Sequence, residues 1–217
     1  MNQEGIKKIA CRLLVFAKAP IPGQVKTRLI PSMGAMAAAS LHKKLVFHSL
    51  KTITNSGLGP VELWCTPSAE HPFFKLCAEK FQLRLRKQTD GDIGKRMAYA
   101  FDHTLRKVPS ALLIGTDCPS LTQDDLKEAA EVLAQGMDAV IGPAEDGGYV
   151  LLGLRRFTPE LFAGISWGTD LVLEQTRACL QSLGRQWHEL KERWDVDRPE
   201  DLKRLRSEGL LKGLEEI

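Results

Sequence analysis

The stretch Ala111-Leu-Leu-Ile-Gly-Thr-Asp117 decides the fold class of this chain. A short, uninterrupted apolar run that ends in a glycine and an Asp is typical of a strand buried on both faces, with a polar loop at its carboxyl end. The segment Cys11–Ala17 has the same apolar character. We therefore expect both segments to be buried strands of one sheet.

Amphipathic stretches alternate with apolar runs along the rest of the chain. Further strands are expected at 61–65, 83–86, 138–142, 149–154 and 187–190, and helices at 35–53, 72–81, 92–107, 122–135, 170–183 and 199–207. This alternation favours an α/β fold with a Rossmann-like, mostly parallel sheet, right-handed crossovers and helices on both faces. Because no repeat or linker interrupts the pattern, we expect a single domain over residues 1–217.

The composition excludes several classes of protein. The 217 residues are 43% hydrophobic and 26% charged, and the formal net charge is only +3. Mixed charges without a basic stripe do not suggest a nucleic-acid partner, and no apolar run is long enough to span a membrane. The five cysteines have neither paired nor metal-finger spacing,. We expect a cytoplasmic protein with reduced thiols.

The loop that follows the first strand, residues 18–32, combines the groups of a phosphate site. Those groups are Lys18, Gly23, Lys26, Thr27 and Arg28. The glycine permits a positive φ or a close backbone approach, the cations attract phosphate oxygens, and the hydroxyl adds a donor. The loop lacks the Walker A spacing, and a solvated basic turn is the alternative interpretation.

A second candidate for anion binding lies in residues 90–97, where two glycines precede a helix that carries Lys95 and Arg96. Helix N-termini attract anions, so Arg96 could contact a donor phosphate. A flexible loop with an exposed basic first turn explains the segment equally well.

Carboxylates follow two of the predicted strands. Asp117 comes directly after the run 111–115, while Asp146 lies in the loop before Tyr149. Carboxylates suit Mg²⁺ or Mn²⁺, and Asp146 could also hold or deprotonate a hydroxyl group. Turn chemistry is the alternative, as an Asx turn at Asp117 and as an Asp-Gly-Gly hairpin turn at Asp146.

A third acidic segment lies near the end of the chain. Asp195 and Asp197 flank Val196, and in an extended segment their side chains point the same way, so they could share a cation,. Asp197 could instead cap the helix that begins near Pro199. We expect Cys118 and the scattered histidines to be packing or surface residues.

Several motifs, in this order and spacing, resemble the bacterial and archaeal glycosyltransferase-like family DUF2064. The similar segments are Lys18-Ala-Pro20, Pro22-Gly23, Lys26-Thr-Arg-Leu29, Gly94-Lys-Arg-Met97, Gly115-Thr-Asp-Cys-Pro119, Gly142-Pro-Ala144, Asp146-Gly-Gly-Tyr149, Trp167, Asp195-Val-Asp197 and Pro199-Glu-Asp-Leu202. The resemblance implies the GT-A, or nucleotide-diphospho-sugar transferase, fold. The family is also similar to 2-phospho-L-lactate guanylyltransferase and to the molybdenum-cofactor nucleotidyltransferases.

The resemblance implies a role for each candidate residue. The implied metal ligands are Asp117 and Asp197, the phosphate-binding residues are Lys18, Lys26 and Arg28, and the acceptor-side residues are Asp146, Tyr149 and Trp167. The chain departs from the glycosyltransferase pattern because it has no Asp-x-Asp at the central strand end. It also departs from the nucleotidyltransferases, whose first loop opens with a glycine-rich run.

The sequence therefore predicts a transferase that depends on Mg²⁺ or Mn²⁺ and uses a nucleotide-activated donor. The leading hypothesis is glycosyl transfer from a nucleotide diphosphate sugar to a small-molecule acceptor. The alternative is nucleotidyl transfer from a nucleoside triphosphate to a phosphorylated acceptor, with release of pyrophosphate. A non-catalytic anion-binding module is a third hypothesis, and a homodimer is compatible with all three.

Overall fold

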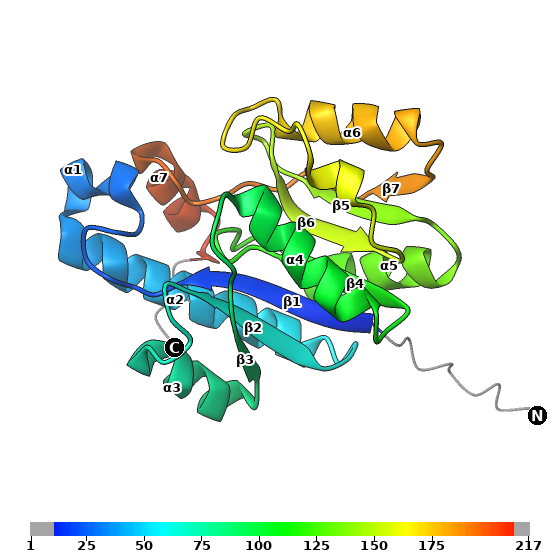
Figure 1. Cartoon of the computed structure of the whole chain (residues 1–217). Helices are drawn as coiled ribbons and strands as arrows, with labels where there is room; N and C mark the ends of the chain where they lie inside the picture. Colours follow the sequence, from blue (N-terminus) through cyan, green and yellow to red (C-terminus); the bar gives the residue numbers. More distant parts are fainter. Residues whose placement is uncertain (1–10, 211–217) are drawn as a thin grey trace, which may run out of the picture.

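The computed structural model describes residues 11–210. Its sheet has seven strands in the order β3-β2-β1-β4-β6-β5-β7. The strands are β1 (Cys11–Lys18), β2 (Val61–Thr66), β3 (Arg84–Lys87), β4 (Ser110–Ile114), β5 (Ala139–Pro143), β6 (Tyr149–Leu154) and β7 (Trp187–Glu189). The predicted α/β fold with a mostly parallel sheet is confirmed, and β1 and β4 lie side by side near its middle (Figure 1).

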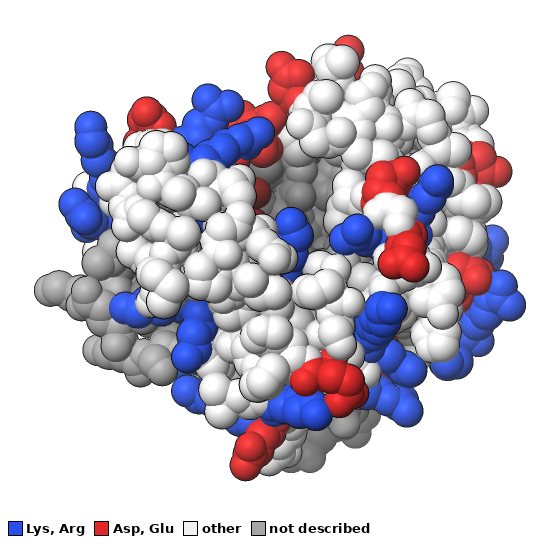
Figure 2. Space-filling model, turned by 60° about the vertical axis from the view of Figure 1, so that its left-hand side comes forward, with Lys and Arg blue, Asp and Glu red and all other residues white. Residues whose placement is uncertain are grey.

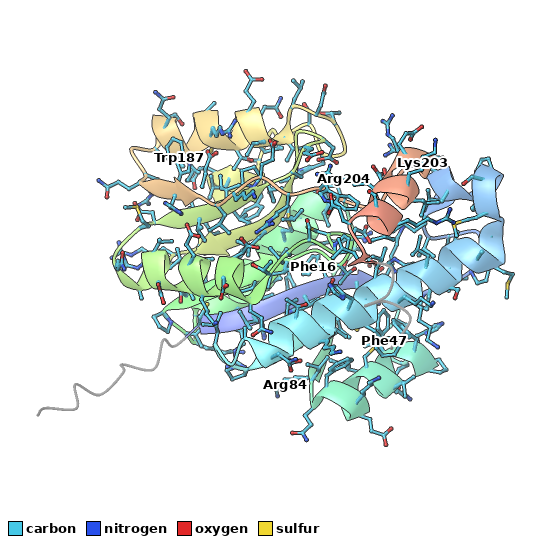
Figure 3. The ribbon with its side chains drawn as sticks, turned by 180° about the vertical axis from the view of Figure 1, so that it is seen from behind. Phe16, Phe47, Arg84, Trp187, Lys203 and Arg204 are labelled. Atoms are coloured by element: carbon cyan, nitrogen blue, oxygen red, sulfur yellow. The ribbon has the colours of Figure 1, made fainter. Side chains whose placement is uncertain are left out.

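Helices cover both faces of the sheet. The helices are α1 (Ile30–Met33), α2 (Ala35–Asn55), α3 (Pro72–Phe81), α4 (Ile93–Leu105), α5 (Gln123–Ala134), α6 (Val172–Ser182) and α7 (Pro199–Ser207), with 3-10 turns η1 (Thr27–Leu29) and η2 (Pro159–Phe162). Helices α2, α3 and α5 lie on the face seen in Figure 3, and α4 and α6 lie on the opposite face. No helix within residues 11–210 combines the length and apolar character needed to cross a membrane.

The alternation of side chains along β1 builds two separate cores. Leu13 and Val15 pack into the cluster formed with α2, α3 and α5. Leu14 and Phe16 point the other way, into the cluster formed with α4, η2 and α6. A strand buried on both faces needs apolar residues at every position, which explains the uninterrupted run in the sequence.

One strand runs against the others. Strand β6 lies between β4 and β5 and is antiparallel to both. The turn between β5 and β6 is short, closed by a hydrogen bond of 3.0 Å from Ala144 N to Gly148 O, and a parallel pair would require a long crossover,. The Asp146-Gly-Gly segment therefore forms the hairpin turn that its sequence allowed.

Several predicted boundaries need correction. Residues 18–32 are not a continuous loop, because η1 and α1 lie within them. Strand β3 is Arg84–Lys87 rather than 83–86, and α6 begins at Val172 rather than at residue 170. The Thr122 side chain and Asp125 form the predicted capping box at the start of α5. The 3-10 turn η2 was not predicted.

A third hydrophobic core joins the segments that border the site. Leu29, Leu45, Trp194, Val196 and Leu205 pack in one cluster. These residues come from η1, α2, the segment before α7, and α7 itself, so residues far apart in sequence meet here. The segment around Val196 is consequently fixed beside the loop that follows β1, on the side of the sheet where α1 and α7 lie (Figure 1).

We predict that Gly153→Ala lowers the free energy of unfolding by roughly 1–3 kcal/mol, because the interior of β6 has no room for a methyl group. A Cβ atom at Gly153 would lie 2.4 Å from Val140 Cγ1 and 2.5 Å from Leu112 Cδ2. Urea unfolding would measure the change. The matched control is Gly115→Ala, where the nearest atom is 3.8 Å away and we expect a change of about 0.5 kcal/mol or less,. Equal effects of the two substitutions would contradict the packing argument.

Candidate active site

Two adjoining cavities open at the carboxyl ends of the parallel strands. The first cavity has a volume of about 480 Å³ and the second a volume of about 740 Å³. Both are lined by Arg28, Ile93, Tyr149, Asp195 and Asp197, so the two spaces meet along these side chains. Figure 2 shows this end of the molecule, with a hollow around which basic and acidic side chains gather. Ligands of open α/β sheets bind at this edge.

A buried lysine organises the first cavity. The side chain of Lys26 is only 3% exposed, and its Nζ donates to Val196 O at 2.6 Å and lies 2.8 Å from Asp117 Oδ1. Its backbone is left-handed, with φ 49° and ψ 43°, a conformation that is uncommon for a residue with a side chain,. The backbone thus adopts an unfavourable conformation while the ammonium group sits between β4 and the segment before α7.

Asp117 remains ionised despite its position. Burial alone would raise its pKa, but the charges and hydrogen bonds of Lys26 and His42 outweigh this effect and hold the pKa far below its usual range. The side chain as a whole is 45% exposed, so one edge of the carboxylate still faces the cavity. Asp117 is therefore more than a local Asx turn, since it balances a buried charge and lines the first cavity.

The prediction that all histidines are packing or surface residues is wrong for His42. Its Nδ1 lies 3.7 Å from Asp117 Oδ1, and its Nε2 contacts Lys18 O at 3.0 Å. Ser49 lies on the same helix and donates to Thr116 O at 3.4 Å. A sequence signal was present, because His42 and Ser49 are polar residues within the buried stripe of α2.

Asp195 is the most perturbed acid of the site. Burial raises its pKa to about 7, and the negative charges of Asp117, Asp146 and Asp197 add to the effect while Lys26 opposes it. Among these neighbouring acids, Asp117 has the largest influence. The structure thus brings Asp117, which follows β4, close to Asp195 and Asp197, which precede α7. The repulsion among these carboxylates contributes to the raised pKa of Asp195.

Asp197 is not the cap of α7. The N-cap residue is Arg198, and Asp201 in the first turn accepts hydrogen bonds from the backbone N–H groups of Asp197 and Arg198, at 2.8 and 2.6 Å. The carboxylate of Asp197 is instead paired with Arg28 and lines both cavities. The predicted metal ligand and a predicted phosphate-binding residue are therefore partners of each other.

The carboxylates fit a hard divalent cation that binds with a substrate. Among residues 11–210, no three His, Cys, Asp or Glu side chains are grouped so that they could enclose a metal ion by themselves. Mg²⁺ usually takes only one or two carboxylates and completes its coordination with water and substrate phosphate oxygens. The exposed edge of Asp117 and the mutually repelling Asp195 supply the oxygen ligands and the negative charge that such an ion needs.

Most of the other residues predicted to contact phosphate line the first cavity. Lys18, Thr27 and Arg96 line the first cavity, and Arg96 Nε also donates to Gly91 O at 2.8 Å. Gly23 has the positive φ that its sequence position suggested, at 83°, but it is not among the lining residues. Its contribution is to the path of the loop rather than to a ligand contact.

The second cavity contains the predicted acceptor-side residues. Asp146, Tyr149 and Trp167 all line it. Asp146 Oδ1 accepts from Gly148 N at 2.9 Å, so this side chain both closes the hairpin turn and borders the cavity. Burial raises the pKa of Tyr149, an effect that Thr176 only partly offsets, so its hydroxyl stays protonated.

Trp167 is held in place by a glycine from another motif. A Cβ atom at Gly94 would lie 2.1 Å from Trp167 Nε1, so the indole ring lies directly against the backbone of α4. Two segments that are about seventy residues apart in the sequence therefore form one wall, which explains why a glycine opens the Gly94-Lys-Arg-Met97 motif.

Gln88 is a polar residue of the first cavity that was not predicted from the sequence. Gln88 is buried and lines the cavity just beyond β3, where its Nε2 donates to Trp64 O at 2.8 Å. The rule that ligands bind at strand ends would have identified it had it been applied to β3. Cys118 is a buried free thiol, and burial together with Asp195 raises its pKa to about 12, which agrees with a packing role.

The fold is shared with solved transferases. A structure from Desulfovibrio desulfuricans G20, provisionally named a nucleotide-diphospho-sugar transferase, is 31% identical, covers 87% of this chain and 82% of its own, and gives a TM-score of 0.79. A CMP-2-keto-3-deoxy-manno-octonic acid synthetase complexed with CTP is 10% identical over 94% of this chain and 99% of its own, with a TM-score of 0.61. Glucosyl-3-phosphoglycerate synthase from Mycobacterium tuberculosis, in complex with Mn²⁺ and UDP, is 10% identical over 93% and 77%, with a TM-score of 0.56. The latter two establish only the GT-A-like fold.

The family comparison covers the middle of the chain. No curated protein matches the sequence. The model of the family DUF2064, described as uncharacterized proteins conserved in bacteria, matches residues 49–169, which include Asp117, Asp146 and Trp167. The chain therefore belongs to the DUF2064 family and has the fold of the nucleotide-diphospho-sugar transferases.

Proposed function

We propose that this protein is a transferase that depends on Mg²⁺ or Mn²⁺ and moves a glycosyl group from a nucleotide diphosphate sugar to a small-molecule acceptor. The observation that carries the proposal is the junction of the two cavities. There the carboxylates of Asp195 and Asp197 lie between a space lined by cations and a space lined by acids, and Asp117 lies beside them in the first cavity. Such a junction separates a donor from an acceptor while keeping both next to one cation site.

The first cavity would bind the donor. Lys18, Arg28 and Arg96 line it with positive charge that can neutralise phosphate oxygens,. Arg28 could exchange its partner Asp197 for a phosphate once Asp197 is engaged elsewhere. Lys26 would reach the phosphates only by loosening its contact with Asp117, so we assign it first to holding that carboxylate in place.

The metal ion would be held by Asp117 together with Asp195 or Asp197. When bound, it would stabilise the negative charge that develops on the departing diphosphate. The chain's own contribution is to orient these carboxylates, with Lys26 and His42 fixing Asp117 from behind. Asp195 would lose its proton on binding the cation, because a positive charge offsets the repulsion of its neighbours.

The second cavity would hold the acceptor. Asp146 Oδ1 is committed to Gly148 N, which leaves Oδ2 available to accept the proton of an attacking hydroxyl group,. Trp167 and Tyr149 would position the acceptor against this carboxylate. A nucleotidyl transfer from a nucleoside triphosphate would use the same donor-side groups and is the competing reaction, with pyrophosphate as its product.

We predict that one nucleotide sugar, in the presence of Mg²⁺ or Mn²⁺, stabilises the protein and is slowly converted to the nucleoside diphosphate. A ligand at about 100 times its dissociation constant stabilises a fold by roughly 2.7 kcal/mol, so thermal shift over panels of nucleotide sugars and nucleoside triphosphates would detect the donor. Product analysis then separates the reactions, since pyrophosphate release would indicate nucleotidyl transfer.

Asp117→Asn should remove turnover and the metal-dependent part of the shift. Asp124→Asn is the matched control, because Asp124 is 91% exposed on α5, where it pairs with Lys127. If neither donor panel shifts the wild-type protein, or if Asp117→Asn behaves like the control, the proposed function is wrong.

We further predict that Asp195→Asn stabilises the metal-free protein at about pH 8 by roughly 1–3 kcal/mol, since cavity water screens part of the shift. The folded-state pKa of Asp195 is raised to about 7 from 3.8, so the native state retains a proton that the unfolded state has lost. Wild-type stability should therefore fall as pH rises from about 4 to 7, and the gain from the variant should shrink towards about pH 4.

Chemical unfolding at both pH values, with chelator present, measures this gain. Added Mg²⁺ should stabilise the wild type and have less effect on Asp195→Asn. A gain of the same size at both pH values would show that Asp195 does not titrate in this way, and the exposed Asp124→Asn exchange should give no such pH-dependent gain.

A further inference from the structure

We infer that the acceptor is a hydroxyl- or amine-bearing molecule without negative charge, and that a phosphorylated acceptor is rejected. This inference rests on the proposed function, because it assigns a chemical class to the substrate of the second cavity. It also bears on the competing reaction, since the nucleotidyl transfer considered above uses a phosphorylated acceptor.

Negative charge predominates in the lining of the second cavity. Its lining contains six carboxylates and two guanidinium groups. The carboxylates belong to Glu145, Asp146, Asp170, Asp195, Asp197 and Asp201, and the guanidinium groups to Arg28 and Arg198. A ligand in this space is therefore surrounded by an excess of negative charge.

Some of these charges are already neutralised by ion pairs. Arg28 is paired with Asp197, and Glu145 is paired with Arg204 at 2.7 Å. Within residues 11–210, no ion pair is formed by Asp146 or Asp170, and the only lining cation left without one is Arg198. If a metal ion takes Asp195 and Asp197, Arg28 is released, but Asp146, Asp170 and Asp201 still outnumber the two guanidinium groups.

The first cavity, by contrast, is lined by several cationic side chains. There Lys18, Arg28 and Arg96 provide the cations that a diphosphate requires. Phosphate groups are bound by several basic side chains or by free backbone N–H groups, and like charges brought together across an interface are strongly unfavourable. The chain therefore contains a phosphate-binding surface, but it lies on the donor side and not on the acceptor side.

The second cavity also has an apolar surface. Ile93, Met97 and Trp167 give it an apolar wall, and Ile93 is 40% exposed at the junction with the first cavity. A carbon ring or chain could pack on this wall while its hydroxyl or amino groups donate to Asp146 and Asp170. Both groups are hydrogen-bond donors, which suits carboxylates that are acceptors only.

The sign of the charge can be tested without turnover. Trp167 lines the second cavity, so its fluorescence reports which ions enter. In the presence of Mg²⁺, we would compare quenching by caesium and by iodide, each normalised to N-acetyltryptophanamide, and isolate the Trp167 signal by subtracting Trp167→Phe. We expect caesium to be favoured by about threefold or more, because a site lined by one sign of charge concentrates the counter-ion.

A pair of variants identifies the carboxylates responsible. The double variant Asp146→Asn/Asp170→Asn should reduce the preference for caesium, whereas Asp124→Asn, which makes the same type of exchange far from the cavity, should not. Iodide quenching equal to or stronger than caesium quenching in the wild type would overturn the inference, whether or not the protein turns over a donor.

The second readout uses acceptors that differ only in a phosphate group. With the donor found by the panels above, transfer to glycerol, glucose and glucosamine would be compared with transfer to glycerol 3-phosphate and glucose 6-phosphate. We expect kcat/KM to favour the unphosphorylated molecules at least tenfold, which corresponds to about 1.4 kcal/mol. Faster transfer to a phosphorylated member would overturn the inference while leaving the proposed function intact. Failure to turn over any donor would instead count against the proposed function, and the quenching result would still decide the charge of the cavity.

Discussion

The ion pair between Lys26 and Asp117 is the interaction on which the rest of the site depends. A buried ammonium group without a partner would be strongly destabilising, so Lys26 can occupy its position only while Asp117 is ionised beside it. The same ammonium donates to Val196 O, which ties the loop after β1 to the segment before α7. One cation thus joins three parts of the chain, and the left-handed backbone of Lys26 is tolerated because these contacts fix it,.

The division of charge between the two cavities follows from the ion pair of Lys26 and Asp117. Lys26 neutralises Asp117, and His42 lies beside the same carboxylate, so Lys18 and Arg96 can make the first cavity basic. Lys26 only partly offsets the effect of burial and of the neighbouring carboxylates on Asp195, whose pKa is raised to about 7, and the second cavity continues into further carboxylates. The donor and acceptor sides proposed here are therefore distinguished by where buried cations are placed, rather than by the size or depth of the two spaces.

Local sequence patterns predicted the fold well because they reflect burial directly. The apolar runs of β1 and β4 have no polar position on either face, and Thr122 with Asp125 forms the cap that the spacing indicates. The strand-end rule selected Asp117 and Asp146, which line the first and the second cavity respectively,. His42 was missed because its role depends on how α2 packs against the β4–α5 loop, and Arg28 gave no sign that Asp197 is its partner. Contacts between segments so far apart in the sequence do not follow from spacing.

The apparent surplus of carboxylates can be understood from the balance of charge in the metal-free state. Lys26 already occupies one oxygen of Asp117, so a divalent cation must either use the exposed edge of that carboxylate or displace the ammonium group. Displacement would leave Lys26 buried without its counter-charge, unless donor phosphates replace the carboxylate. Metal and donor are thus expected to bind together rather than in sequence, because each supplies the charge that the other's arrival leaves unbalanced. Under the proposed function, a bound cation would offset the repulsion that Asp195 meets from its neighbouring acids.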